Sequence, residues 1–191
     1  SASLVGSEMC IRDSCYCMIE LLILYVLQKR DLTMYAIQKR IDENFAPFTK
    51  PSFGAIKPAL RRLEEKQCIS SRKNMSDGGK LSVYYQISNK GVSELKRLIL
   101  EDLSDNPLQF LSNARVKLSC ADCLDKTDRK RLFFSLKALS MQFKTDAQNI
   151  LNDEYNRINF YQKIILDNAL CEYSNFLTII EGLEKDNAGN S

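Results

Sequence analysis

The chain has 191 residues and a formal net charge of +3, and 45% of its residues are hydrophobic, which argues against wholesale disorder. It has seven cysteines but no histidine, so the usual general base and the usual partner of a catalytic serine or cysteine are missing, and the composition disfavours an enzyme. An odd cysteine count in a chain longer than typical disulfide scaffolds indicates reduced thiols and a cytoplasmic protein.

The N-terminal segment divides into a leader and a first helix. Leu4–Ser14 resembles a translated sequencing-adaptor peptide, so residues 1–14 are expected to be a non-native or disordered leader. The apolar run Cys15–Leu27 is too short to span a bilayer and contains Glu20, which argues against a membrane segment. Helical spacing of its apolar residues predicts a buried first helix: Met18, Leu21, Leu22 and Tyr25.

Two further helices are predicted on either side of a proline-containing loop. The second begins at an N-cap, Thr33, and runs to about Phe45. Ala46–Pro51 holds two prolines and interrupts the pattern, and Ser52 can then cap the third helix. The third helix has an apolar stripe of Phe53, Ile56, Leu60 and Leu63. Its opposite side presents Gly54, Lys57, Arg61 and, at the edge, Arg62.

The period of the pattern then changes from helical to strand-like. Cys68–Lys73 leads to a turn signal at Ser76–Gly79, and Val83, Tyr85 and Ile87 alternate with polar residues as in a half-buried strand. Ser88 is predicted to cap a fourth helix. Residues 50–97 contain eleven cations and four anions, a net charge of +7, while the rest of the chain sums to −4. Such asymmetry indicates a polyanionic partner for this segment.

The remainder is predicted to be wholly helical. A short helix is expected over Leu108–Leu118, a long helix capped by Thr127 follows, and a last helix spans about Glu154–Leu183. Apolar residues exceed what one helix pair can bury, for example Phe134, Phe160, Ile164, Tyr173 and Ile179. A two-fold homodimer through these helices and the first helix would cover them. The alternative is that they cover the first domain.

Three blocks in this order resemble the PadR family of bacterial transcriptional regulators: Met34–Ile41, Ser52–Glu65 and Gly78–Gly91. The resemblance implies a mainly α fold, with a winged helix-turn-helix domain and a two-stranded wing over residues 15–104 and a helical dimerisation domain over residues 105–191. Two positions depart from the family pattern. Lys57 stands where a tyrosine is usual, and Met34 stands where many members carry glycine.

The function expected is a repressor that binds an inverted-repeat operator as a homodimer. Lys57 and Arg61 occupy the exposed side of the third helix and are the candidates for contacting base edges. Tyr35, Ser52 and Arg62 would hold phosphates, and Arg72, Lys73 and Lys80 would grip the DNA backbone through the wing. The competing hypothesis is an adaptor, in which the winged helix binds protein and no specific DNA.

Regulation is the least determined property. The resemblance implies release by a small aromatic or lipophilic effector near the dimer interface. Six aromatic residues could line its pocket: Tyr16, Tyr25, Phe110, Phe160, Tyr161 and Phe176. Control without an effector, or through oxidation of Cys120 and Cys123, remains open. Cys120 and Cys123 have metal-knuckle spacing, but no second pair completes a zinc site, and neither a metal nor a cofactor is expected.

Overall fold

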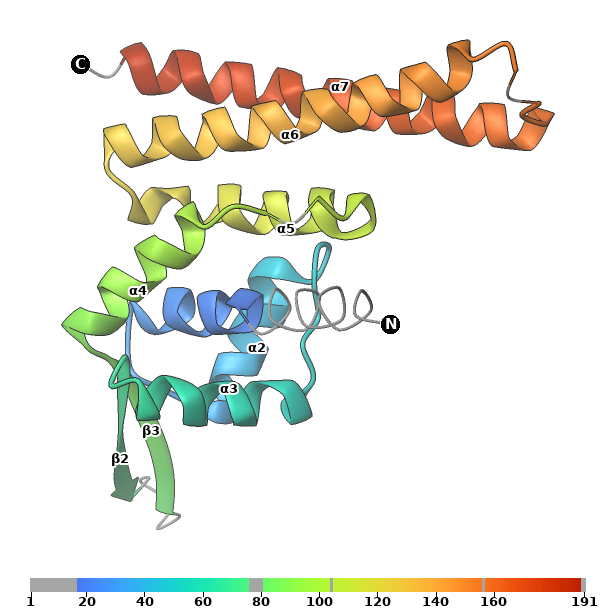
Figure 1. Cartoon of the computed structure of the whole chain (residues 1–191). Coiled ribbons are helices and arrows are strands. Elements are labelled where there is room, and N and C mark those ends of the chain that lie inside the picture. The colour runs from blue at the N-terminus through green and yellow to red at the C-terminus, as the bar shows by residue number, and fades with distance from the viewer. Residues whose placement is uncertain (1–16, 76–80, 104, 156, 190–191) are drawn as a thin grey trace, which may run out of the picture. The chain divides into compact units, whose positions relative to one another are not determined.

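The chain folds into two compact units, residues 1–123 and 124–191 (Figure 1). The computed structural model describes residues 17–75, 81–103, 105–155 and 157–189, so the expected leader at residues 1–14 lies outside the described part. The domain boundary predicted at residue 104 lies within the first of these units, which ends at Cys123. None of the described helices combines the length and the apolarity needed to cross a bilayer.

The first unit packs helices around a central apolar helix at residues 17–27, in which Leu22, Ile23 and Leu24 are fully buried. The other elements of the unit follow in this order: β1 (Leu32–Thr33), α2 (Met34–Phe45), α3 (Phe53–Glu65), β2 (Ile69–Met75), β3 (Leu81–Ile87), α4 (Asn89–Leu100), α5 (Pro107–Ser119) and the short 3₁₀ helix η1 (Ala121–Cys123). These bounds confirm the predicted helix–loop–helix–hairpin–helix order.

Side chains at the helix ends explain where the helices begin and stop. The Thr33 hydroxyl accepts a hydrogen bond from the Ala36 amide at 3.3 Å, and the predicted cap of α2 is confirmed. Ser88 caps α4 in the same way, with its hydroxyl 3.1 Å from the Gly91 amide. At the end of α3, Gln67 has a left-handed φ of 59°, and the amides of Gln67 and Cys68 bond back to α3 carbonyls in a Schellman arrangement.

The sheet is antiparallel with the strand order β1-β3-β2, and its long hairpin is the wing. Ile69 pairs with Ile87 at the base and Met75 with Leu81 near the tip. The two-stranded wing was predicted, but the third strand was not, because β1 has only two residues and exists through its pairing with β3. The strand was predicted from the alternation of Val83, Tyr85 and Ile87, and Val83 is exposed because it lies well out along the hairpin.

The second unit is a hairpin of two long helices, α6 (Lys126–Asn152) and α7 (Phe160–Gly189), which lie side by side (Figure 1). Its core includes Leu132, Leu136, Phe143, Phe176 and Ile180, which are all buried. Tyr173, expected at the surface, is also buried and stacks on Phe143 with ring centroids 5.8 Å apart.

The first residues of both helices differ from the prediction. The α6 helix begins one residue before Thr127, and the carboxylate of Asp125 accepts the capping bond. The α7 helix begins at Phe160, six residues later than predicted. Asn159 and Gln162 exchange two side-chain-to-amide bonds of 2.9 Å, which form a reciprocal capping box that starts the helix there.

A buried lysine closes the end of α4. Lys117 on α5 is 3% exposed, and its ammonium group donates to the Leu98 carbonyl at 3.0 Å and to the Glu101 carbonyl. Carbonyls at a helix C-terminus lack partners within the helix, so Lys117 satisfies groups that would otherwise be buried unpaired. Burial lowers the pKa of Lys117 to about 8.

We expect this lysine to make stability depend on pH. Between about pH 8 and the ordinary lysine pKa near 10.4, the unfolded chain holds a proton that the folded chain has released, so the free energy of unfolding rises with pH. Relative to the Lys117→Met variant, the wild-type chain should gain about 2 kcal/mol between pH 7 and pH 9.5. Urea unfolding at both pH values measures this gain.

Subtracting the variant removes the contributions of tyrosines and cysteines, because both proteins share them. Lys130→Met, at an exposed position of α6, is the matched control and should leave the pH dependence of the wild-type chain unchanged. A parallel pH dependence for wild type and Lys117→Met would show that the folded and unfolded chains bind the Lys117 proton equally.

Candidate nucleic-acid interface

One face of α3 is bare of protein and carries positive charge. Its residues, all exposed, are Ser52, Phe53, Gly54, Lys57 and Arg61, and we call this set the basic face. On the other side of α3, Ile56, Leu60 and Leu63 are buried, and these three predicted core positions are confirmed. Gly54 serves no packing purpose, because an added Cβ would meet only the Ser52 hydroxyl oxygen at 3.7 Å.

The two cations of the basic face can bind DNA groups, because their present interactions are weak or absent in the described part of the chain. Arg61 bonds to Glu65 at 2.9 Å, but the Arg61 side chain is 82% exposed. An exposed pair of this i,i+4 kind contributes only about 0.3–0.5 kcal/mol, so a phosphate or a base could replace it. Within the described part of the chain, no ion pair involves Lys57. Both residues expected to contact base edges therefore project into solvent.

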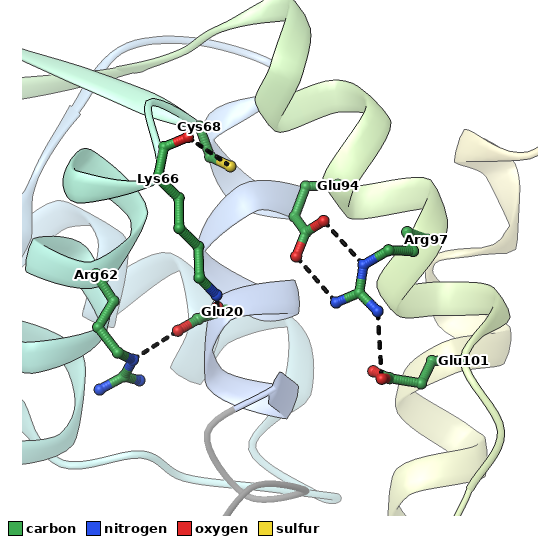
Figure 2. A network of polar contacts seen from close by, with 7 residues as sticks. All are labelled: Glu20, Arg62, Lys66, Cys68, Glu94, Arg97 and Glu101. Atoms are coloured by element: carbon green, nitrogen blue, oxygen red, sulfur yellow. Dashed lines mark hydrogen bonds and ion pairs between the residues drawn. The ribbon is translucent and has the colours of Figure 1, made fainter.

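Arg62 lies differently from the other predicted DNA contacts. Its Nε donates to Glu20 Oε1 at 2.7 Å, and Lys66 Nζ donates to Glu20 Oε2 at 2.9 Å (Figure 2). The Glu20 side chain is 3% exposed, while those of Arg62 and Lys66 are 31% and 48% exposed. The hydrogen bond to Glu20 raises the pKa of Lys66. These two cations thus neutralise a buried carboxylate of the first helix and join α3 to it.

The wing adds cations to the same unit. Arg72 on β2 bonds to Asp31 at 2.7 Å, which ties the wing to the segment before β1. Lys73 is exposed. Lys80 lies outside the described residues, so its position is not assigned. The structure therefore places one wing cation in solvent and one in an ion pair.

Two exposed aromatic rings stack at the N-terminal end of the basic face. Tyr35, on the first turn of α2, is 69% exposed and stacks on Phe53, with ring centroids 6.2 Å apart and planes at 18°. Phe53 is 41% exposed, so its expected place in the buried stripe is wrong. It is the first residue of α3 and lies beyond the packed turns. Ser52, at the N-cap, makes no side-chain capping bond.

The residues expected to bind an effector occupy separate places. Phe110 in the first unit and Phe176 in the second are buried, and Tyr16 lies outside the described residues. Tyr25 meets Phe45 edge to face, with centroids 5.6 Å apart. Phe160 and Tyr161 are exposed at the start of α7. Tyr161 lines a pocket of about 530 Å³ together with these residues: Ile150, Ile158, Asn159, Gln162, Ile165 and Leu166.

Of the two cysteines considered for redox control, Cys120 is buried and Cys123 is half-buried. Cys120 is fully buried, and burial raises its pKa. Burial also raises the pKa of Cys123 to about 12. The thiolate is the reactive form, so both side chains are poorly reactive at neutral pH. Among the described residues there is no group of three or more cysteine, histidine or carboxylate side chains that could hold a metal ion.

Several solved structures similar to this chain are described as PadR or PadR-family regulators. A PadR-family regulator from Clostridium difficile R20291 is 32% identical, over 41% of this chain and 80% of its own, with a TM-score of 0.37. Bacillus subtilis PadR in complex with operator DNA is 18% identical, over 88% of this chain and 98% of its own, with a TM-score of 0.40. The same protein in complex with p-coumaric acid is 19% identical, over 91% and 97%, with a TM-score of 0.37.

All three TM-scores are below 0.5, so the family of this chain is assigned from sequence similarity and not from structural similarity. A search of the curated proteins returns no match. Residues 23–97 match the family model described as the transcriptional regulator PadR-like family. That span includes α2, the basic face of α3 and both strands of the wing. The chain belongs to the PadR-like family of transcriptional regulators.

Proposed function

We propose that this protein is a bacterial cytoplasmic repressor that binds an inverted-repeat DNA site as a homodimer. The observation that carries the proposal is the basic face of α3, exposed on a winged helix within the segment that matches the family model. In helix-turn-helix proteins the second helix of the motif enters the major groove and its N-terminal residues contact base edges. Lys57 and Arg61 occupy the exposed positions suited to that role.

The remaining predicted contacts would position the protein on the DNA backbone. Tyr35 and Ser52 are exposed at the N-terminal ends of α2 and α3, and Lys73 is exposed on the wing. Arg72 would have to share its guanidinium with Asp31, and Arg62 would have to do so with Glu20. We therefore propose Tyr35, Ser52 and Lys73 as the principal phosphate contacts, with Lys80 as a further one.

Exposed apolar side chains on the second unit support the homodimer. They lie on both long helices and remain uncovered by the described part of the chain: Phe134, Met141, Ile150, Phe160, Tyr161, Ile164, Ile165 and Ile179. Exposed apolar side chains gathered on one element pair commonly mark an interaction surface, and a second copy would bury them. A two-fold dimer presents two basic faces and so requires a two-fold DNA site.

The proposed repressor also responds to a small effector. One relative has been solved with p-coumaric acid. The pocket beside Tyr161 has a volume of about 530 Å³, which falls in the usual range for small-molecule sites. Ile150, Ile158 and Ile165 line it, with Asn159 and Gln162 as polar groups. We propose that an aromatic or lipophilic molecule binds there and releases the DNA by favouring a different dimer arrangement.

A matched pair of variants tests the DNA-binding function. Arg61→Ala should weaken binding to the selected operator about tenfold and relax base preference, because arginine recognises guanine through two hydrogen bonds. Lys73→Ala should weaken binding to all sequences alike and lower the salt dependence by about one ion per protomer. Fluorescence anisotropy between 50 and 200 mM salt measures both effects.

The same complexes distinguish the competing function. Multi-angle light scattering of the wild-type complex should give two copies of the chain per operator. An adaptor that binds only protein would enrich no duplex from a random pool and would show no steep loss of DNA affinity with salt. Either of those results from the wild-type chain would contradict the proposed function.

A further inference from the structure

Phe53 is an apolar ring at the N-terminal end of a polar and basic surface. The other four residues of the basic face are two cations, one serine and one glycine. Phe53 is 41% exposed, although the apolar residues that follow it on α3, Ile56 and Leu60, are at most 2% exposed. The exposed part of this ring is therefore available for an apolar contact with a molecule that binds the basic face.

The ring is held in place by its neighbour. Tyr35 comes from the first turn of α2, and the two rings stack with centroids 6.2 Å apart and planes at 18°. Stacking restricts the ring of Phe53 before any partner arrives, which lowers the entropy lost on binding. Gly54 beside it has no side chain, and Lys57 follows Phe53 by four residues, about one turn further along the same side of α3.

The charges around the ring select the kind of partner. Lys57 and Arg61 share the basic face with Phe53, and the segment from residue 50 to residue 97 has a net charge of +7. An apolar protein surface would have to desolvate these cations, whereas DNA pairs them with phosphates and base acceptors. In the major groove the apolar group on a base edge is the C5-methyl group of thymine, and phenylalanine is among the side chains that contact it.

We propose that Phe53, positioned by Tyr35, contacts the methyl group of a thymine in each half-site and is a specificity-determining residue of this protein. The inference rests on the proposed DNA-binding function and adds to it a base type and the side chain that recognises it. On the basic face, Phe53 would then contact a methyl group, while Lys57 and Arg61 would donate hydrogen bonds to base acceptors.

Deoxyuridine provides the test, because it pairs as thymidine does but lacks the methyl group. A duplex is first selected from a random-sequence pool with the wild-type chain, and each thymine is then replaced by uracil in turn. At one position per half-site, wild-type affinity should fall about fourfold, the value expected for one buried methyl group. Replacement in both half-sites should cost about 15-fold.

The variants assign that loss to the ring. Phe53→Ala should bind the thymine duplex about fourfold more weakly per half-site and should not distinguish uracil at that position. Phe53→Leu should retain part of the discrimination. Tyr35→Phe keeps the stacked rings without the hydroxyl and should retain all of it, and Lys57→Ala should also retain it. Circular dichroism confirms that each variant is folded.

Two results would overturn the inference while leaving the proposed function intact. In one, wild type binds its selected duplex but tolerates uracil at every thymine. In the other, a uracil effect is found but Phe53→Ala shows the same effect at the same position. If the wild-type chain enriches no duplex at all, the proposed function fails and this inference fails with it.

Discussion

Replacing Gly91 with alanine should destabilise the first unit by roughly 3 kcal/mol or more, the upper end of what overpacking costs. Gly91 lies in the first turn of α4, directly against the start of the wing. An added Cβ would lie 2.7 Å from Ile87 Cγ1 and closer still to the carbonyl oxygen of Cys68. That oxygen already accepts hydrogen bonds from the amide and the hydroxyl of Ser88, so the backbone there has little freedom to move.

Gly182 supplies the matched control. It lies inside α7, and nothing comes within 4 Å of a Cβ added there. Gly182→Ala should therefore stabilise the second unit by about 0.5–1 kcal/mol, the helix propensity difference alone. Urea unfolding followed by circular dichroism, with hydrogen exchange to separate the two units, measures both variants. Equal stability of Gly91→Ala and wild type would mean that α4 can move away from Cys68 without cost.

Features set by local chemistry were predictable. Thr33 and Ser88 cap their helices because a hydroxyl at that position can accept a hydrogen bond from the backbone amide three residues later. The buried positions of α3 followed from helical spacing. The predicted start of α7 near Glu154 was too early, although the Asn159–Gln162 capping box that begins the helix at Phe160 is visible in the sequence.

Features set by distant contacts were not predictable. The β1 strand forms only because Leu32 meets Tyr85, a residue far along the chain. Arg62 and Glu20 are 42 residues apart, so no local pattern links the cation to its carboxylate. Phe53 fits the apolar spacing of α3, yet it is 41% exposed and its ring stacks on another exposed residue, Tyr35. In each case the outcome depends on what the fold brings close, and periodicity carries no information about that.

Substitutions in the cluster of Glu20, Arg62 and Lys66 should lower the free energy of unfolding, by an amount that depends on which partner is removed. Arg62→Met combined with Lys66→Met leaves the buried carboxylate of Glu20 without its two cations, which should cost about 3–5 kcal/mol. Glu20→Gln alone should cost much less, because both cations are partly exposed and can be hydrated by water. Urea unfolding at neutral pH measures each variant.

A triple variant separates charge from packing. Adding Glu20→Gln to the Arg62→Met and Lys66→Met pair removes the buried charge itself, so most of the lost stability should return, to within about 1 kcal/mol of Glu20→Gln alone. Absence of rescue would mean that the methylenes and hydrogen bonds of the two cations, and not their charge, hold α3 to the first helix. The rescued protein also isolates the DNA role of Arg62. A salt dependence equal to that of Glu20→Gln would show that Arg62 supports the basic face from behind without holding a phosphate.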